Sequence, residues 1–227
     1  MKTISSYWPQ VRNAIPTELL GQSGKVFYSG RQAFSAPSSL YILGLNPGGD
    51  PEKLSADSIE KQADWVSAIA PEDWSAYRDE SWQEKPPGRH GMQPRVLHLF
   101  RSIGLQPGAV PSSNLVFVRS RRERDIASSF GQLADMCWPF HRFVIATLRP
   151  KVVLCFGQRA GGYIRRQTEA IDQYACFTEN NNRKWQTKAY RSAKGLKVIV
   201  TTHPSIADWT AEDTDPSSIV RDALHDA

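Results

Sequence analysis

Residues 40–45 read LYILGL, and the chain then continues through Asn46, Pro47 and two glycines to Asp50. A short, near-continuous apolar run of this kind is typical of a strand buried on both faces, as in a parallel sheet covered by helices. Residues 114–118 (NLVFV), 152–156 (VVLCF) and 197–202 (KVIVTT) have the same character. These four runs predict the strands of one sheet.

Helical periodicity separates the predicted strands. Residues 94–103 and 139–148 each open on a proline and place apolar side chains along one side of a helix. Further helices are expected after Gly157 and over residues 217–224. This alternation predicts an α/β protein with three layers, α/β/α, around a central, mainly parallel four-stranded sheet.

Two long segments interrupt the alternation within what we expect to be a single domain over residues 1–227. The segment 50–91 is rich in aromatic residues and ends in a Pro/Gly-rich stretch, and its part 58–70 can be helical. The segment 173–195 can form a hairpin or a helix-loop excursion. Long ordered insertions in compact domains are often functional loops.

Composition limits the class of protein. Apolar residues make up 40% and charged residues 22% of 227 residues, which is enough apolar material for a sizeable core. The net charge of +5 permits a polyanionic partner without requiring one. The three cysteines are scattered without C-x-x-C spacing, which argues against a disulfide framework, a zinc knuckle or a four-cysteine iron–sulfur cluster. We expect no metal and no cofactor.

Neither a signal peptide nor a membrane segment is apparent. The first 16 residues lack the apolar stretch of a signal peptide, and no run approaches the ~20 apolar residues of a membrane span. We therefore expect a cytoplasmic protein, a monomer, that does not enter a membrane.

Polar side chains follow the first and the last predicted strands. Asn46 comes directly after the first, and His203 follows the last in Thr202-His203-Pro204-Ser205. Since the carboxyl ends of parallel strands meet at one edge of a sheet, we expect both side chains in one cleft. Each can also have a purely structural role, because Asn46 can satisfy the backbone of a tight turn and His203 can be a structural hydrogen-bonding group.

In combination, these motifs resemble the uracil-DNA glycosylase superfamily: GLNPG at the first strand end, Gly-x-x-Ala from Gly157 after the third strand, and His-Pro-Ser after the last. The first motif is most similar to the mismatch-specific and single-strand-selective branches, which have Asn where the main family has Asp. The last motif, which contains His203, is similar to the main and single-strand-selective branches, whereas the mismatch-specific branch has Asn at this position. The resemblance covers roughly residues 40–205 and extends to neither insertion.

The resemblance implies a DNA glycosylase that removes uracil or another deaminated or mismatched base by hydrolysis of the N-glycosidic bond. Asn46 would position a water against the anomeric carbon through its side-chain amide. An amide accepts no proton near neutral pH, so slower chemistry than with a carboxylate is expected. His203 would donate a hydrogen bond to the base oxygen that gains negative charge. The expected partner is DNA, single-stranded or as a mismatched duplex.

The resemblance also assigns binding residues. Asn114 would read the base edge, which requires it to end a strand and not to start one. A stacking ring would come from Tyr77, Trp82 or His90, among which the sequence does not discriminate. The predicted substrate-binding residues are Gly44, Leu45, Pro47, Gly48, Gly49, Asn114 and Ser205, and the predicted DNA-binding residues are Arg119, Arg121, Arg122 and Ile206.

Other classes of function stay open. The basic run from Arg119 to Arg124 can be a solvated turn as well as a phosphate-binding surface. The superfamily stacks the flipped base on an aromatic ring soon after the first motif, but residues 49–54 contain none. Related enzymes also insert an apolar wedge into the duplex, for which Ile206 is expected here, but Asp208 lies close to it in the sequence. Both features favour a protein that binds a modified base or a nucleic-acid end without cleaving it. A third possibility is an enzyme that acts on free nucleosides or nucleotides.

Overall fold

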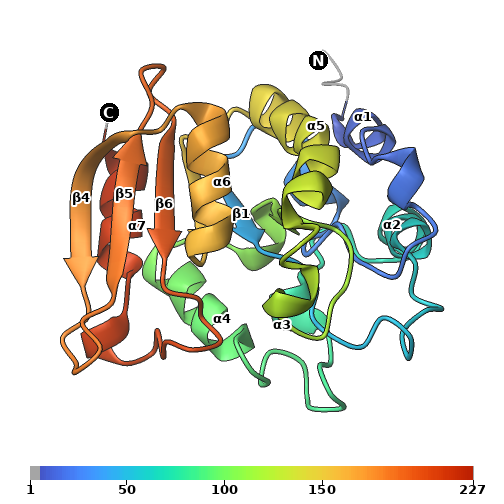
Figure 1. Cartoon of the computed structure of the whole chain (residues 1–227), viewed down its shortest axis with the longest axis horizontal. Coiled ribbons are helices and arrows are strands. Elements are labelled where there is room, and N and C mark those ends of the chain that lie inside the picture. Colours follow the sequence, from blue (N-terminus) through green and yellow to red (C-terminus); the bar gives the residue numbers. More distant parts are fainter. Residues whose placement is uncertain (1–5, 227) are drawn as a thin grey trace.

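A six-stranded, mostly parallel sheet forms the centre of the protein in the computed structural model, which describes residues 6–226 (Figure 1). The strands are β1 (Leu40–Gly44), β2 (Ser112–Asn114), β3 (Val152–Phe156), β4 (Asp172–Thr178), β5 (Gln186–Arg191) and β6 (Lys197–Thr201). Their order across the sheet is β2-β1-β3-β6-β5-β4. The first four in this order are parallel, and β5 is antiparallel to both of its neighbours.

The α/β class is confirmed, but the predicted count of four strands is wrong. The two additional strands come from the insertion at 173–195, which forms a hairpin, one of the two predicted alternatives. This hairpin extends the sheet through pairing of β5 with β6, where Tyr190 lies opposite Val198. Both strands have partly exposed residues along their length, so they lack the continuous apolar run that identifies a fully buried strand.

The second predicted strand lies earlier in the chain than expected. The strand is Ser112–Asn114, and the apolar residues 115–117 lie buried just beyond it. Buried serines can form a strand here because their hydroxyls are satisfied: Ser113 Oγ donates to the carbonyl of Val26 at 2.7 Å. Asn114 therefore ends the strand, beside Gly44 at the end of β1.

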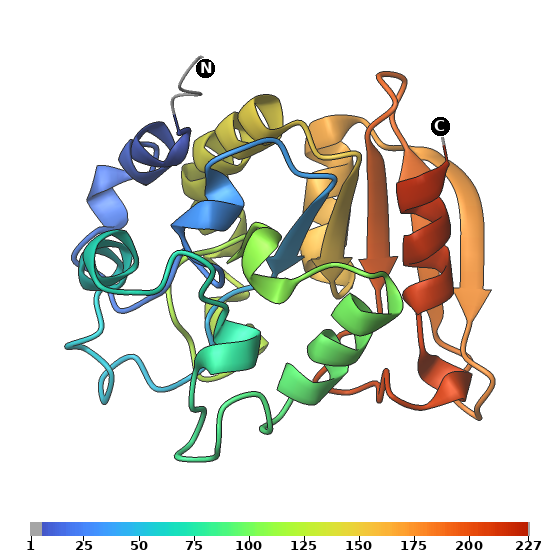
Figure 2. The same cartoon turned by 180° about the vertical axis from the view of Figure 1, so that it is seen from behind.

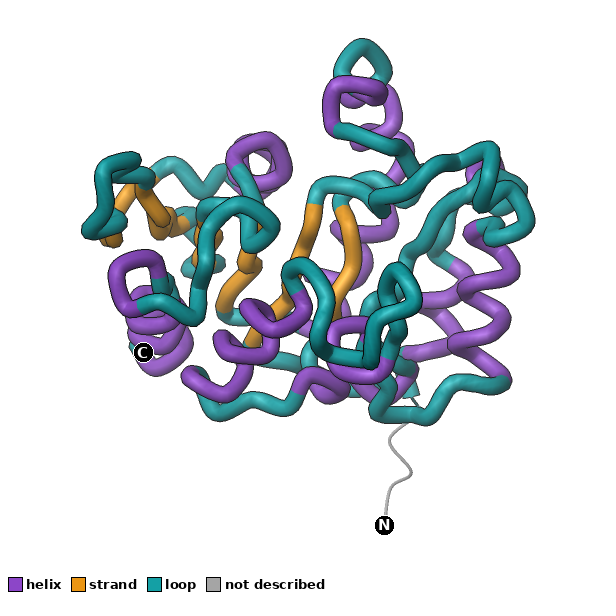
Figure 3. The backbone as a smooth tube through the Cα atoms, turned by 90° about the horizontal axis from the view of Figure 1, so that it is seen from below, coloured by secondary structure: helices purple, strands orange, loops and turns teal. Residues whose placement is uncertain are grey.

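Helices cover both faces of the sheet (Figures 1, 2 and 3). They are α1 (Trp8–Asn13), α2 (Ile59–Ala68), α3 (Ala76–Asp79), α4 (Gln93–Ser102), α5 (Phe130–Leu148), α6 (Gln158–Thr168) and α7 (Ser217–His225). Alternate side chains of β1 enter two different cores. Tyr41 and Leu43 join the core beneath α5 and α6, whereas Leu40 and Ile42 join the core beneath α4 and α7.

Helix α5 begins nine residues earlier than predicted and carries Pro139 in its interior. A proline inside a helix removes one backbone hydrogen bond and costs about 3 kcal/mol. Ala134 and Cys137, upstream of the proline, are fully buried and extend the apolar side of the helix. Burial of these additional apolar side chains outweighs the loss of the hydrogen bond at Pro139. The proline therefore lies inside the helix and does not mark its start.

Packing of α6 on β6 depends on a glycine, which leads to a prediction about stability. A Cβ on Gly161 would lie 2.4 and 2.5 Å from the two methyl carbons of Val200, whereas a Cβ on Gly162 would meet only the Arg166 side chain at 3.8 Å. We expect Gly161→Ala to lower the free energy of unfolding by about 1–3 kcal/mol through overpacking. Gly162→Ala should raise it by up to about 1 kcal/mol, because alanine favours the helix.

Urea unfolding of the two variants and the parent measures this difference directly. Equal effects of the two substitutions would contradict the packing of α6 against β6.

Candidate functional site

A cleft of about 1000 Å³ lies at the carboxyl edge of the parallel strands. It extends from the end of β1, past β3 and β6, to β5 of the hairpin, with the first turn of α6 on one side. Asn46 and His203 both line it. The structure thus brings together the carboxamide and the imidazole that the sequence predicts at one sheet edge.

The amide of Asn46 is oriented by three acceptors. Its Nδ2 donates to the carbonyls of Pro47 and Val118, both at 3.2 Å, and to Ser120 Oγ at 2.8 Å. Carbonyl oxygens only accept hydrogen bonds, so the nitrogen of the amide must face them. Oδ1 makes no hydrogen bond with any residue from 6 to 226, and this oxygen is the group that Asn46 can offer to a molecule in the cleft.

The tautomer of His203 is set by the turn that follows it. The backbone N–H of Ser205 donates to His203 Nδ1 at 3.1 Å, and Ser205 Oγ lies 2.7 Å from the same nitrogen. Because a backbone N–H only donates, Nδ1 is unprotonated and the neutral ring carries its proton on Nε2. Burial lowers the pKa of His203 to about 4. The ring is therefore a neutral hydrogen-bond donor at pH 7.

A second histidine, which the sequence pattern did not distinguish, connects β1 to the residue after β2. His141 of α5 is fully buried, with Nε2 3.0 Å from the Leu115 carbonyl and Nδ1 2.8 Å from the Tyr41 hydroxyl. The carbonyl requires a proton on Nε2, so Nδ1 accepts from Tyr41. Burial lowers the pKa of His141 to about 4. This bridge connects β1 to the residue that follows Asn114.

These two histidines predict an acid-sensitive fold. In the unfolded chain each takes up a proton near pH 6.5, but in the folded protein only near pH 4. The unfolded state thus binds more protons between these values, and stability falls as pH decreases. From pH 7.5 to 5.0 we expect the free energy of unfolding to drop by about 2–4 kcal/mol, at up to about 1.4 kcal/mol per pH unit per histidine.

Urea unfolding at several pH values tests this expectation. His203→Gln, which removes one of the two titrating groups, should reduce the slope by about half. A free energy of unfolding that is the same at pH 7.5 and pH 5.0 would contradict the assignment of two neutral rings with lowered pKa values.

Asn114 lies at the predicted edge of the sheet but does not line the cleft. It is only 5% exposed, and its Nδ2 is buried without a hydrogen-bond partner among the described residues. A Cβ on Gly44 would lie 2.1 Å from Asn114 Oδ1, so only glycine permits this close approach. Asn114 thus ends a strand, as the base-reading role requires, although the predicted strand 114–118 began with this residue. Its expected place in the cleft wall is not found.

The other predicted site residues divide into two groups. Those that line the cleft are Leu45, Gly48, Arg121, Arg122, Ser205 and Ile206, and those that do not are Gly44, Pro47, Gly49, Asn114 and Arg119. Arg119 instead donates from Nη1 to the Gly48 carbonyl at 2.6 Å. Arg121 pairs with Asp50 at 2.9 Å, and this hydrogen bond lowers the pKa of Asp50. Part of the basic run therefore holds the glycine turn in place.

None of the three candidate stacking rings lines the cleft. Tyr77 is buried in the core, with its ring centre 6.1 Å from that of Trp82 and 6.5 Å from that of Phe156. The aromatic side chains in the cleft wall are instead those of Phe156, Trp185 and Tyr190. Phe156 meets the His203 ring edge-on at 6.2 Å and an interplanar angle of 84°.

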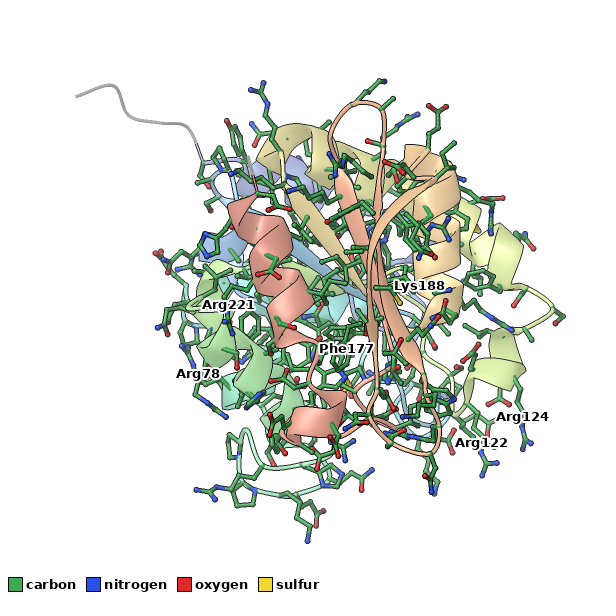
Figure 4. The ribbon with its side chains drawn as sticks, turned by 90° about the vertical axis from the view of Figure 1, so that its left-hand side faces the viewer. Arg78, Arg122, Arg124, Phe177, Lys188 and Arg221 are labelled. Carbon is green, nitrogen blue, oxygen red and sulfur yellow. The ribbon has the colours of Figure 1, made fainter. Side chains whose placement is uncertain are left out.

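Several lining residues were not predicted: Ser120, Glu123, Phe156, Gln158, Arg159, Lys184, Trp185, Gln186, Lys188 and Tyr190. The signal that could have identified the strand residues is the alternation of Gln186, Lys188 and Tyr190, which places them on one face of a strand. Figure 4 shows Lys188 on the side of the sheet that carries α6, with Arg122 and Arg124 on the same side and Phe177 on the other. This polar face continues the cleft beyond β6.

The charge of the cleft wall is positive. Arg159 is neutralised by Glu123 at 2.9 Å. Arg122, Lys184 and Lys188 form no ion pair within residues 6–226. The cleft is therefore suited to an anionic ligand.

No group of three or more His, Cys, Asp or Glu side chains in the described part of the chain could hold a metal ion. Within residues 6–226, no helix has both the length and the apolar character needed to cross a bilayer. In comparisons with known proteins, no family model and no curated protein matches this chain.

Proposed function

We propose that this protein is a DNA glycosylase of the uracil-DNA glycosylase type, which hydrolyses the N-glycosidic bond of uracil or of another deaminated or mismatched base. One observation carries the proposal: Asn46 and His203 share a cleft, with an acceptor oxygen free on the first and a protonated Nε2 on the second. Further support comes from the motifs at the carboxyl ends of the parallel strands β1, β3 and β6, where open α/β sheets bind ligands.

In the proposed reaction, the carboxamide of Asn46 orients the nucleophile. Its Oδ1 accepts a hydrogen bond from a water, whose oxygen is thereby directed at C1′ of the nucleotide. The bond between this oxygen and C1′ forms as the bond between C1′ and the base nitrogen breaks. Because an amide is not a base, the surplus proton of the water leaves to solvent.

His203 acts on the leaving base. As the glycosidic bond breaks, its electron pair moves onto the base and negative charge develops on a carbonyl oxygen. Nε2–H of a neutral imidazole donates to that oxygen and stabilises the departing anion, which solvent then protonates. A positioned donor of this kind acts without reorganisation during the reaction.

The residues at the rim of the cleft indicate whether the protein would act on single-stranded, mismatched or fully paired DNA. Ile206, the predicted wedge, is 56% exposed next to the cleft. Two residues later, Asp208 pairs with Arg95 at 3.5 Å, which offsets its charge beside a DNA phosphate. Extrusion of a base from a duplex costs a few kcal/mol and is least costly for mismatched or single-stranded sites. We therefore propose that the protein acts on single-stranded or mismatched DNA. We also propose that it acts as a monomer.

The proposal is tested with oligonucleotides that carry uracil, hypoxanthine, xanthine or a thymine mismatch, each as a single strand and as a duplex. We expect abasic sites, revealed as alkali-sensitive breaks, on at least one of these substrates. Absence of abasic sites on all of them, with protein that is folded by circular dichroism, would overturn the proposal.

A second candidate is a protein that binds a modified base or a nucleic-acid end without cleaving it. The observation that favours it is the position of Asn114, which lies buried away from the cleft that holds Asn46 and His203. Salt-sensitive binding of DNA without any release of base would support this candidate against the first.

A further inference from the structure

The β4–β5 hairpin gives the cleft a wall that the Asn46 and His203 motifs do not account for. We define the arm as residues 179–190, from the end of β4 to the cleft-facing part of β5. Five of its residues line the cleft: Lys184, Trp185, Gln186, Lys188 and Tyr190. The indole of Trp185 is 41% exposed, which is unusual for so large an apolar side chain.

Trp185 is held in a fixed position by Arg183. The guanidinium of Arg183 lies over the indole at 4.3 Å from the ring centre. The same guanidinium pairs with Glu179 Oε2 at 3.1 Å, and Glu179 is only 2% exposed. An indole that packs on an arginine paired with a buried carboxylate loses little side-chain freedom when a ligand stacks on it.

Arg183 also connects the arm to the catalytic side of the cleft. Its Nη1 donates to the carbonyl of Ile206 at 2.8 Å. Ile206 follows His203 by three residues, and its backbone N–H donates to the His203 carbonyl at 3.0 Å. The arm is thus fastened to the loop that carries His203, and Trp185 has a defined position relative to the proposed reaction centre.

The positive charges in the cleft wall near Trp185 in the sequence favour an anionic ligand. Lys184 and Lys188 line the same cleft as Trp185 and have no carboxylate partner in the part of the chain that the structure describes. Residues 179–190 contain a single acid, Glu179, which is neutralised by Arg183. Exposed aromatic rings combined with cations that follow a backbone are the features with which proteins bind single-stranded nucleic acid. In a paired duplex the faces of the bases are covered by neighbouring bases, so no base face is exposed for the Trp185 indole to stack on.

From this geometry we infer that the arm is a second DNA-contacting site, in which Trp185 stacks on an unpaired base beside the target nucleotide and Lys188 contacts the adjoining phosphate. The inference rests on the proposed function, because it takes DNA as the ligand. It goes beyond that function in naming a site outside the reaction centre and in assigning the protein a preference for single strands.

The test measures binding of an undamaged, fluorescein-labelled single-stranded oligonucleotide by anisotropy, so that no base release is needed. Stacking on one aromatic side chain predicts that Trp185→Ala weakens binding by about tenfold or more and that Trp185→Phe weakens it less. Lys188→Ala should weaken binding and reduce the slope of log K against log salt by about 0.7.

Two matched controls accompany these variants. Trp65 of α2 is 36% exposed but lies outside the cleft, and Lys194 is exposed in the turn between β5 and β6. Trp65→Ala and Lys194→Ala should both bind within twofold of the parent. Melting curves establish that every variant is folded.

Unchanged binding by Trp185→Ala, an equal loss in Trp65→Ala, or tighter binding of a matched duplex than of the single strand would each overturn the inference. So would tighter binding of the corresponding RNA. Failure of the proposed function is a separate outcome: it would appear as absence of base release while the loss in Trp185→Ala remained. Base release with unaltered binding in Trp185→Ala would overturn the arm site alone.

Discussion

We expect His203→Ala to lower the rate of base release by about 10²–10³-fold, the effect of removing one preorganised donor to a developing negative charge. The reason lies in the tautomer: the Ser205 backbone N–H donates to Nδ1, so the proton is on Nε2, and His203 lines the cleft. The loss should appear in kcat and in kcat/KM alike, since the hydrogen bond strengthens in the transition state. Single-turnover assays with excess enzyme measure it.

The controls for His203 separate chemistry from structure. His203→Gln retains an N–H donor and should recover part of the rate. Ser205→Ala removes the hydroxyl next to Nδ1 but keeps the backbone N–H that fixes the tautomer, so we expect a much smaller loss than in His203→Ala. A rate for His203→Ala within a factor of three of the parent would remove this side chain from the mechanism.

Asn46→Ala should lower the rate of base release by about 10²-fold, because misplacement of a nucleophile by about 1 Å has an effect of this size. Asn46→Asp tests the amide donor more directly, because it replaces Nδ2 and keeps the size of the side chain. It would put a carboxylate oxygen where Nδ2 now lies 3.2 Å from the carbonyls of Pro47 and Val118. The Ser120 hydroxyl already donates to the carbonyl of Arg122 at 3.0 Å. The new carboxylate oxygen would therefore face acceptors, and the variant should be slower than the parent.

Rates of the Asn46 variants are measured in the same single-turnover assay. Ser120→Ala, which removes one of three acceptors for the amide, serves as the graded control and should have an intermediate rate. A faster Asn46→Asp enzyme would show that the site accepts a carboxylate, and it would contradict the role assigned to the amide donors.

The parallel half of the fold could be predicted from the sequence because most of its strands are apolar and buried on both faces. Runs such as residues 152–156 are apolar throughout, and a buried strand bounded by turn residues is the structure that best fits this pattern. β2 could be placed less accurately, since its residues are serines whose hydroxyls are satisfied by tertiary contacts that no local pattern reveals. The strands of the hairpin are half exposed, so their mixed composition resembles that of a loop.

The same distinction applies to the site. Asn46 and His203 follow buried strands directly, and topology alone brings such residues to one edge. Lys188 and Trp185 reach the cleft only because the hairpin adds to the sheet beside β6, which depends on long-range pairing. The buried position of Asn114 depends on its close approach to Gly44, which a strand boundary does not specify.

The measurement that tests the account most directly is the amount of free base released from the preferred oligonucleotide, quantified by mass spectrometry together with the abasic product. The parent protein should release one base per abasic site formed, and the double variant Asn46→Ala/His203→Ala should release base only at the rate of the protein-free control. Equal release by the parent and the double variant would contradict the claim that these two side chains act together on one nucleotide.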